Sequence, residues 1–355
     1  MKVPCPAGLL LILAPACVAG PGDSAGAPAF EGAVVALQDQ ASLGFLDVEG
    51  ELRGTLDLSS VVDGQPEMWM VHNVQITPDG RTAVATAMAP MGDTGTMSAA
   101  PDQLLVVDLV SLELLRRCDL DIGMGVAHVV TDGVTAWATA FTEDIVVLVD
   151  IGTCRESARW PLPAGTGPHG LRRSADGASV YVAGMGDGSL HHFDAVTGAK
   201  TSWDLPGLAV QVAVVPDGSA VFATLIDTLQ VARLDVATAT VVVYDLPEGS
   251  LGPAQAYPSP DSSAVWVADQ GATGGIAGHE LFRVDAATGE TTARVVVSEG
   301  PHGVVVSADG ATVWTTTLTT GTVDRVDVGS LTLITSTLVG PGPNGISLSS
   351  GGVMP

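Results

Sequence analysis

One pattern of residues recurs along most of this 355-residue chain. Its clearest copy runs from Pro301 to Asp327 and reads as an apolar strand, an Asp-Gly turn and a second apolar strand containing Trp314. A polar loop then leads to a third strand that ends at Asp327. Such a repeat restricts the fold more than composition does, because every copy must form the same unit and bury its apolar face against the next copy.

Asp-Gly turns mark the copies. They occur at Asp79-Gly80, Asp132-Gly133, Asp176-Gly177, Asp217-Gly218 and Asp309-Gly310, with the variant Asp261-Ser262. Asp-Gly between two apolar runs predicts a β-hairpin, because both residues tolerate positive φ. Four positions after the glycine, or after Ser262, large or β-branched residues predict a strand packed between neighbouring sheets. These residues are Val84, Trp137, Tyr181, Phe222, Trp266 and Trp314.

An aspartate ends the third strand of each copy. The seven are Asp47, Asp108, Asp150, Asp194, Asp235, Asp285 and Asp327. A short carboxylate in this position accepts hydrogen bonds from turn amides, so we interpret all seven as turn caps and not as catalytic groups. Seven units of about four strands in roughly forty residues each predict an all-β, seven-bladed β-propeller over residues 31–355.

The two ends of the chain complete this prediction. Residues 343–348 form a first strand with no full copy after it, whereas residues 33–47 lack a first strand before them. We therefore expect the C-terminal strand to pair with the N-terminal blade and close the ring, which removes exposed sheet edges.

The repeat resembles the YVTN-type β-propeller repeat of secreted bacterial and archaeal proteins. The resemblance is carried by Pro301-His302-Gly303, Ser307-Ala308-Asp309-Gly310, Val313-Trp314-Thr315-Thr316 and Val326-Asp327, and again by the copy from Pro168 to Gly198. It covers nearly all of the chain after residue 31 and implies the fold. The wider group includes surface proteins of unknown role, lactonase-like enzymes and the propeller part of the copper enzyme nitrous oxide reductase, so the resemblance does not select an activity.

The first 17 residues predict an export signal. Lys2 precedes the short apolar core Gly8–Leu13, which is too short to span a bilayer. The following residues resemble a lipoprotein cleavage box in which Cys17 would be acylated, and ordinary cleavage after Ala16 or Ala19 is the alternative. Residues 18–30 are rich in Gly, Pro, Ala and Ser, which suits a flexible tether.

An exported protein is expected in the periplasm or on the outer cell surface, where thiols oxidise. We therefore expect a disulfide between Cys118 and Cys154. The chain has 14 Lys and Arg against 39 Asp and Glu, a formal net charge of −25. This charge disfavours nucleic acid, and it leaves the membrane as a partner only through the lipid anchor. We expect a monomer.

Histidines and amides recur at the start of the first strands, which share one end of the propeller, the channel mouth. They are His72, His128, His169, Gln211, Gln255, His302 and Asn344. We assign the four histidines as metal ligands, because neutral imidazole suits zinc and copper and three or four converging ligands make a sufficient site. We assign Gln211, Gln255 and Asn344 to ligand binding.

The register of this group is uneven. His72, His169 and His302 each stand seven positions before the aspartate of their turn, Gln211 and Gln255 stand six before theirs, and His128 stands only four before. A one-residue slip turns a side chain to the other face of a strand. The alternative interpretation is that the Pro-His-Gly start is ordinary for this repeat and that the imidazoles only bond to neighbouring backbone or to water.

The repeat also places arginines and methionines near the channel mouth. Arg172 and Arg173 are the nearest basic pair, and since side chains alternate along a strand we assign the ligand-facing role to Arg173. His191, His192 and His279 are expected to be peripheral and solvated. Methionines near the mouth would suit copper, although methionine also fills gaps in cores. They are Met68, Met70, Met88, Met91, Met97 and Met124.

Three functions stay open at this point. The first is a binding or scaffold module that engages a protein or small-molecule partner at the channel mouth, and it rests on the tether, the acidity and the absence of a catalytic signature. The second is a metalloprotein, a copper oxidoreductase or a metal-dependent hydrolase, that uses the histidine ring. The third is a metal-free, lactonase-like hydrolase or lyase. Within the repeats, residues 31–355, the sequence contains no Gly-Xaa-Ser-Xaa-Gly turn, no phosphate loop of the type that ends in Gly-Lys-Ser/Thr and no Cys-Xaa-Xaa-Cys-His.

Overall fold

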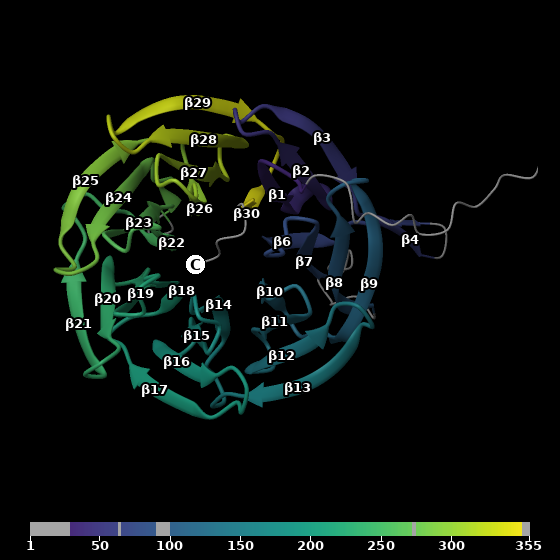
Figure 1. Cartoon of the computed structure of the whole chain (residues 1–355), viewed down its shortest axis with the longest axis horizontal. Helices are drawn as coiled ribbons and strands as arrows, with labels where there is room; N and C mark the ends of the chain where they lie inside the picture. Colours follow the sequence, from purple (N-terminus) through teal and green to yellow (C-terminus); the bar gives the residue numbers. More distant parts are fainter. Residues whose placement is uncertain (1–28, 63–64, 90–99, 272–274, 350–355) are drawn as a thin grey trace, which may run out of the picture.

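The computed structural model describes residues 29–62, 65–89, 100–271 and 275–349. These residues form seven four-stranded antiparallel sheets arranged as blades around a central axis (Figure 1). The first strand of each blade lies innermost and the last lies on the rim. The expected seven-bladed β-propeller is confirmed.

The blades follow one another along the chain. From the centre outward, blade 1 consists of β30 (Pro343–Leu348), β1 (Ala33–Leu37), β2 (Ser42–Leu46) and β3 (Leu52–Asp57). In the same order, blade 2 consists of β6 (Met70–Ile76), β7 (Thr82–Met88), β8 (Pro101–Asp108) and β9 (Glu113–Ile122). Blade 3 consists of β10 (Val126–Thr131), β11 (Thr135–Ala140), β12 (Ile145–Asp150) and β13 (Arg155–Pro161). Blade 4 consists of β14 (Pro168–Arg173), β15 (Ser179–Gly184), β16 (Ser189–Asp194) and β17 (Lys200–Asp204).

The remaining blades repeat this arrangement. Blade 5 consists of β18 (Ala209–Val214), β19 (Ala220–Leu225), β20 (Gln230–Asp235) and β21 (Thr240–Asp245). Blade 6 consists of β22 (Pro253–Pro258), β23 (Ala264–Asp269), β24 (Glu280–Asp285) and β25 (Thr291–Val296). Blade 7 consists of β26 (Pro301–Val306), β27 (Thr312–Thr317), β28 (Thr322–Asp327) and β29 (Thr332–Leu338). A short hairpin, β4 (Ser60–Val62) and β5 (Gln65–Glu67), stands apart, and the turn η2 (Gln38–Gln40) joins β1 to β2.

Blade 1 contains both ends of the described chain. β30 pairs antiparallel with β1, with Leu348 opposite Ala33 and Ile346 opposite Val35. The backbone N–H of Ser349 also donates to the carbonyl of Gly32, 2.9 Å away. The ends of the propeller are therefore held together by backbone hydrogen bonds.

Apolar side chains pack between neighbouring blades. Val84, Trp137, Tyr181, Phe222, Trp266 and Trp314 are all buried, as their place in the repeat predicts. Between blades 3 and 4, for example, Trp160 stacks on Phe193 with ring centres 4.9 Å apart. Burial between the sheets fixes the relative positions of the inner strands, and these strands carry the candidate site.

The Asp-Gly turns work differently from a two-residue hairpin. Only the glycine has a positive φ, as at Gly177 (70°) and Gly310 (71°), and Ser262 adopts the same conformation at 62°. The aspartate instead accepts hydrogen bonds within the loop, as Asp176 does from Ala178 N–H at 2.9 Å. The seven aspartates that end the third strands also accept from turn amides, which confirms them as caps.

Cys118 and Cys154 form a disulfide with a Cα–Cα distance of 4.9 Å. It links β9 on the rim of blade 2 to the turn after β12 in blade 3 and closes a span of 36 residues. Because cross-linking a loop of this length restricts the unfolded chain, a Cys118→Ala/Cys154→Ala variant is expected to lose about 3 kcal/mol of unfolding free energy. Chemical denaturation measures this loss. Reducing the wild-type protein should produce a similar loss, and no change in either sample would contradict a stabilising role.

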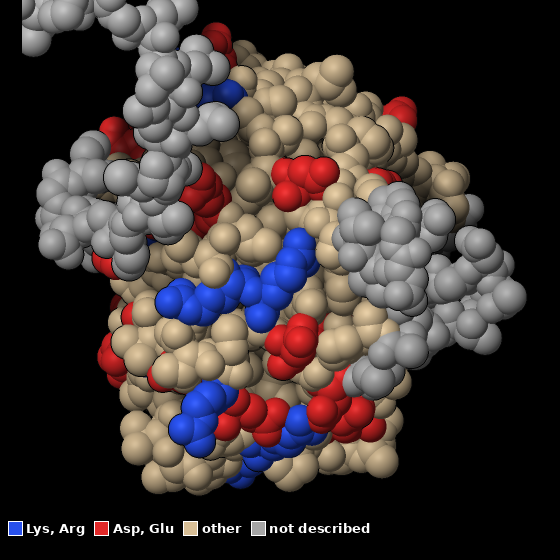
Figure 2. Space-filling model, turned by 90° about the vertical axis from the view of Figure 1, so that its right-hand side faces the viewer, with Lys and Arg blue, Asp and Glu red and all other residues tan. Residues whose placement is uncertain are grey.

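The surface is acidic overall without being uniformly so. On the side shown in Figure 2, basic and acidic side chains lie interspersed. Several form ion pairs, such as that between Arg294 and Glu280. The expected export signal, the tether up to residue 28 and Cys17 lie outside the described residues, and so do Met91 and Met97. Within the described part, no helix is both long and apolar enough to cross a bilayer.

Candidate functional site

A β-bulge interrupts the first strand of every blade at the mouth end. In β14, Pro168 pairs with Gly184 and Leu171 with Val182, so that His169 and Gly170 together stand opposite one residue of β15. The same shift occurs in β6, β10, β18, β22, β26 and β30. A bulge puts two consecutive residues opposite one, and so it changes where their side chains point.

Side chains from both bulge positions meet inside the ring. The first positions hold His72, Ala127, His169, Val210, Ala254, His302 and Asn344. The second positions hold Asn73, His128, Gly170, Gln211, Gln255, Gly303 and Gly345. In six blades a Gly, Ala or Val stands beside the larger polar residue, and this leaves room for it. The difference between spacings of seven and six is therefore a choice between two bulge positions. His128 stands two positions closer still to its aspartate because the turn of blade 3 is shorter, with Thr131 opposite Ala136 where blade 4 has Arg173 opposite Val180. Neither difference moves His128, Gln211 or Gln255 away from the site.

Buried threonines hold these bulges in place. The N–H of the second bulge residue donates to a threonine hydroxyl on the second strand, for example His128 N–H to Thr139 Oγ1 at 3.0 Å. The same hydroxyl donates to the next blade, here to the carbonyl of His169 at 2.6 Å. Thr86, Thr224 and Thr316 make the equivalent pair of bonds. The sequence pattern did not predict this role for the threonines, although each interrupts an apolar strand at an equivalent place.

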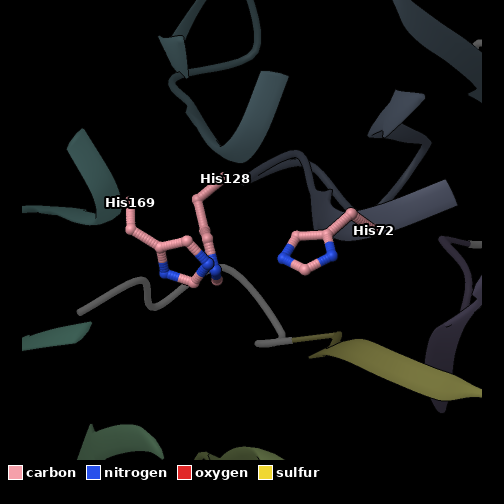
Figure 3. A group of neighbouring side chains, drawn as sticks. All are labelled: His72, His128 and His169. Atoms are coloured by element: carbon pink, nitrogen blue, oxygen red, sulfur yellow. The ribbon is translucent and has the colours of Figure 1, made fainter. Parts of the chain in front are cut away.

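Three imidazoles converge at the mouth end of the ring. One ring nitrogen each from His72, His128 and His169 lies within 4.8 Å of the other two. The rings of His128 and His169 lie side by side with centres 4.7 Å apart, and His72 points toward them from the adjacent blade 2, with its ring centre 5.4 Å from that of His128 (Figure 3). His302 is farther away, with its ring centre 6.5 Å from that of His72.

Oxygen acceptors orient two of the three rings. His72 Nδ1 lies 2.8 Å from Gln38 Oε1, and His169 Nδ1 lies 2.9 Å from the carbonyl oxygen of Val210. Because these oxygens only accept, we assign the proton to each Nδ1 and a lone pair to each Nε2. Asn344 Nδ2 also lies 3.2 Å from His72 Nδ1, and with this assignment that contact is not a hydrogen bond. His72 Nε2 is buried and has no hydrogen-bond partner in the described structure.

His302 repeats this arrangement in blade 7. Its Nδ1 lies 2.7 Å from Gln270 Oε1, and its Nε2 is also buried without a partner in the described part of the chain. Gln38 follows β1 and Gln270 follows β23, so both lie between a second and a third strand. Those loops share the mouth end with the bulges, as the blade topology predicts, but neither glutamine stands out in the sequence.

His128 has a different environment, because amide groups flank both of its nitrogens. Gln211 Nε2 lies 3.4 Å from Nδ1, and Gln255 Nε2 lies 3.2 Å from Nε2. A neutral imidazole has one acceptor nitrogen, so only one of these contacts is a hydrogen bond. The two glutamines also bond to each other at 2.6 Å. His128 is thus held between two glutamines, and one of its contacts is unfavourable.

All four imidazoles are neutral at physiological pH. Burial lowers the pKa of His72 and His128 well below the usual value, and the neighbouring histidines lower both further. Burial also lowers the pKa of His169, and it lowers that of His302 to about 4. A group of neutral imidazoles with bare nitrogens is a set of donors for a transition metal.

Of the other residues that the sequence assigns to the site, Asn344 lies with the histidines and Arg173 does not. Asn344 Nδ2 donates to Gln38 Oε1 at 3.0 Å and so belongs to the group. Arg173 lies at the opposite end of β14, where its guanidinium stacks 4.7 Å from the centre of the Trp137 ring and faces Asp132. It makes no contact with the histidines, whereas the neighbouring Arg172 faces the inside of the ring.

Two expectations about nearby side chains need correction. His191 is buried, not solvated, because Ser189 and Ser202 bond to its two ring nitrogens at 2.7 Å each. Met124 is fully buried in the core between blades 2 and 3, where Met88 packs against the same cluster. These two methionines fill core space and do not lie at the metal-ligand positions.

Comparisons with known proteins agree on the fold. Streptogramin B lyase has 16% sequence identity to this chain over 78% of this chain and 86% of the lyase chain, with a TM-score of 0.64. Hydrazine synthase of Kuenenia stuttgartiensis has 19% identity over 79% and 90%, with a TM-score of 0.65. A functionally unknown protein of Desulfotomaculum acetoxidans has 11% identity over 90% and 99%, with a TM-score of 0.68. No family model matches the sequence, and no curated protein does either. At these identities the likeness shows the propeller fold and no activity.

Proposed function

We propose that this chain is an exported binding module whose ligand site is the mouth end of the ring, and that the site holds one transition-metal ion. His72, His128 and His169 would be the ligands. The observation that carries the proposal is their convergence, with one nitrogen of each ring within 4.8 Å of the other two. Three protein ligands with a further position left open are typical of zinc sites that bind a second molecule.

The hydrogen bonds behind the histidine rings support this proposal. Histidines that bind a metal usually donate their other N–H to an oxygen acceptor, which fixes the ring and raises its basicity. Gln38 and the Val210 carbonyl do this for His72 and His169. A histidine with a purely structural role would be expected to use both nitrogens, whereas His72 leaves Nε2 buried and unpartnered.

The spacing requires a small movement on binding. Zinc bonds imidazole nitrogen at about 2.0–2.1 Å, which places two ligand nitrogens about 3.4 Å apart in a tetrahedral site. The ring nitrogens would have to approach one another by up to roughly 1.4 Å from the present limit of 4.8 Å. Since His128 makes one unfavourable amide contact, turning this ring loses little hydrogen bonding. Copper and zinc both suit the donors.

Elemental analysis of protein purified without chelators or a histidine tag tests this proposal. We expect about one zinc, copper or iron per chain, and a His72→Ala/His128→Ala/His169→Ala variant should contain none. His279→Ala is the matched control, because His279 is exposed and is not one of the three converging histidines. Wild-type protein without metal, even after incubation with zinc or copper, would overturn the metal site. It would favour a metal-free binding module, or a lyase or hydrolase as the third hypothesis has it.

A further inference from the structure

Arg172 is the residue that the proposed function leaves unexplained. It lies in β14, three positions after His169, and its guanidinium is 5.7 Å from the centre of the Tyr257 ring. Tyr257 belongs to β22, two blades away, and β18 stands between these two strands in the ring. Because these are the innermost strands, Arg172 extends along the inside of the ring past β18.

The guanidinium has no carboxylate partner. Its hydrogen bond goes to the neighbouring Leu171 carbonyl at 3.0 Å, and its Nε is buried without any partner in the described structure. Five of the other arginines form ion pairs with Asp or Glu: Arg53, Arg159, Arg173, Arg233 and Arg294. Arg173 and Arg325 also have a buried Nε without a partner, but Arg173 faces Asp132. No acidic side chain comes within 4 Å of Arg172 in the part of the chain that the structure describes.

Such a charge is costly to keep. Arg172 is partly buried, with its Nε fully so, and a positive charge that is partly removed from water without a partner destabilises the fold unless a counter-ion accompanies it. The protein carries 39 acidic residues, yet none of those in the described structure is placed here. A small recess adjoins the guanidinium and is lined by Arg172, Val214, Tyr257 and Pro258 together with Arg173. This recess is narrow and leaves room beside the guanidinium for a group of only a few atoms.

The charge on the inside of the ring near Arg172 is positive, like that of Arg172 itself. The histidines there are neutral, the amides of Gln211 and Gln255 carry no charge, and Arg172 is close enough to lower the pKa of His128. A bound metal ion would add further positive charge. Because the described residues inside the ring bring no carboxylate to Arg172, its positive charge attracts anions there, even though the outside of the molecule is strongly acidic.

We infer that the inside of the ring binds a small carboxylate, held by the Nε edge of Arg172. A guanidinium presents a planar fork that matches the two oxygens of a carboxylate. The bare Nε belongs to such a fork, and the recess beside it admits only a small group. The recess lies at the far end of the inner strands from the histidines, because Arg173, Val214 and Pro258 end β14, β18 and β22. This carboxylate site is therefore separate from the proposed site at the mouth and does not depend on the metal.

Calorimetric titration of metal-free, chelator-treated protein with sodium formate in HEPES buffer tests this inference. We expect saturable binding at one site per chain, at least tenfold weaker in Arg172→Gln. Arg173→Gln is the matched control, because Arg173 borders the same recess but already faces Asp132. It should bind formate within threefold of wild type.

Thermal unfolding gives an independent readout. Formate should raise the melting temperature of the wild type and not of Arg172→Gln, and without formate this variant should be at least as stable as wild type. If Arg172→Gln does not fold, Arg172→Lys keeps the charge without the fork and should bind formate more weakly. No saturable heat in the wild type, or equal affinity in wild type, Arg172→Gln and Arg172→Lys, would overturn the inference. Metal content is measured separately, so either proposal can fail alone.

Discussion

His169→Ala is expected to lower the affinity for zinc at least 100-fold. The ring of His169 is 4.7 Å from that of His128 and 5.6 Å from that of His72, so its loss leaves two ligands of the converging group. Loss of a second-shell partner alone costs about 10–100-fold in metal affinity, and the loss of a ligand should cost more. Competition with a chromophoric chelator measures the affinity directly.

Two further variants separate ligands from neighbours. Gln38→Ala removes the oxygen that holds the His72 Nδ1 proton, and we expect it to weaken zinc binding about 10–100-fold while His72 remains. His302→Ala removes the most distant imidazole and should weaken binding less than tenfold. If His302→Ala instead weakens binding as strongly as His169→Ala, the ligand set includes His302 and the ring closes farther than the three-ligand geometry requires.

Much of the fold follows from the sequence because each copy of the repeat has the same local requirements. An Asp-Gly turn needs a glycine at positive φ, and an aspartate after a third strand caps the next turn. The capping aspartate recurs seven times, so the number of blades can be counted from residues such as Asp194 and Asp285. Burial of Trp266 and Trp314 between sheets follows from the same register.

The candidate site depends on contacts that no local pattern specifies. The sequence pattern does not predict the bulge, because His72 and His128 occupy different positions within it and therefore stand at different distances from the aspartates of their turns. Gln38 meets His72 only after β30 and β1 have joined in one blade. Arg172 and Arg173 are adjacent in sequence, and strand alternation predicts that just one of them faces inward. It cannot say which, because the bulge before them changes the alternation: Arg173, the residue assigned from the sequence, packs on Trp137, whereas Arg172 reaches Tyr257.

Gly170→Ala tests the bulge itself, and this variant is expected to lose about 3 kcal/mol of unfolding free energy. A Cβ built on Gly170 overlaps Gln211 Oε1 and lies 2.6 Å from the Cα of Gln211. The second contact is with the backbone of the neighbouring blade, so rotating a side chain does not relieve it. Chemical denaturation measures the loss. Gly54→Ala is the matched control, because Gly54 also lies in a strand but has nothing within 4 Å of its Cβ position, and we expect it to change stability by less than about 0.5 kcal/mol.

The same substitution connects the architecture of the ring to its chemistry. Displacing Gln211 moves an amide that flanks His128, and the bulge that is strained also carries His169. Gly170→Ala should therefore weaken zinc binding, whereas Gly54→Ala should not. A Gly170→Ala/Gln211→Ala double variant removes the overlap with the side-chain Oε1 of residue 211 but keeps the overlap with its Cα. The loss of unfolding free energy in the double variant should therefore be about 1 kcal/mol smaller than the sum of the losses in the two single variants. If Gly170→Ala keeps full stability and unchanged zinc affinity, blades 4 and 5 are not packed against each other at this bulge. The small size of residue 170 would then not be what makes room for the site.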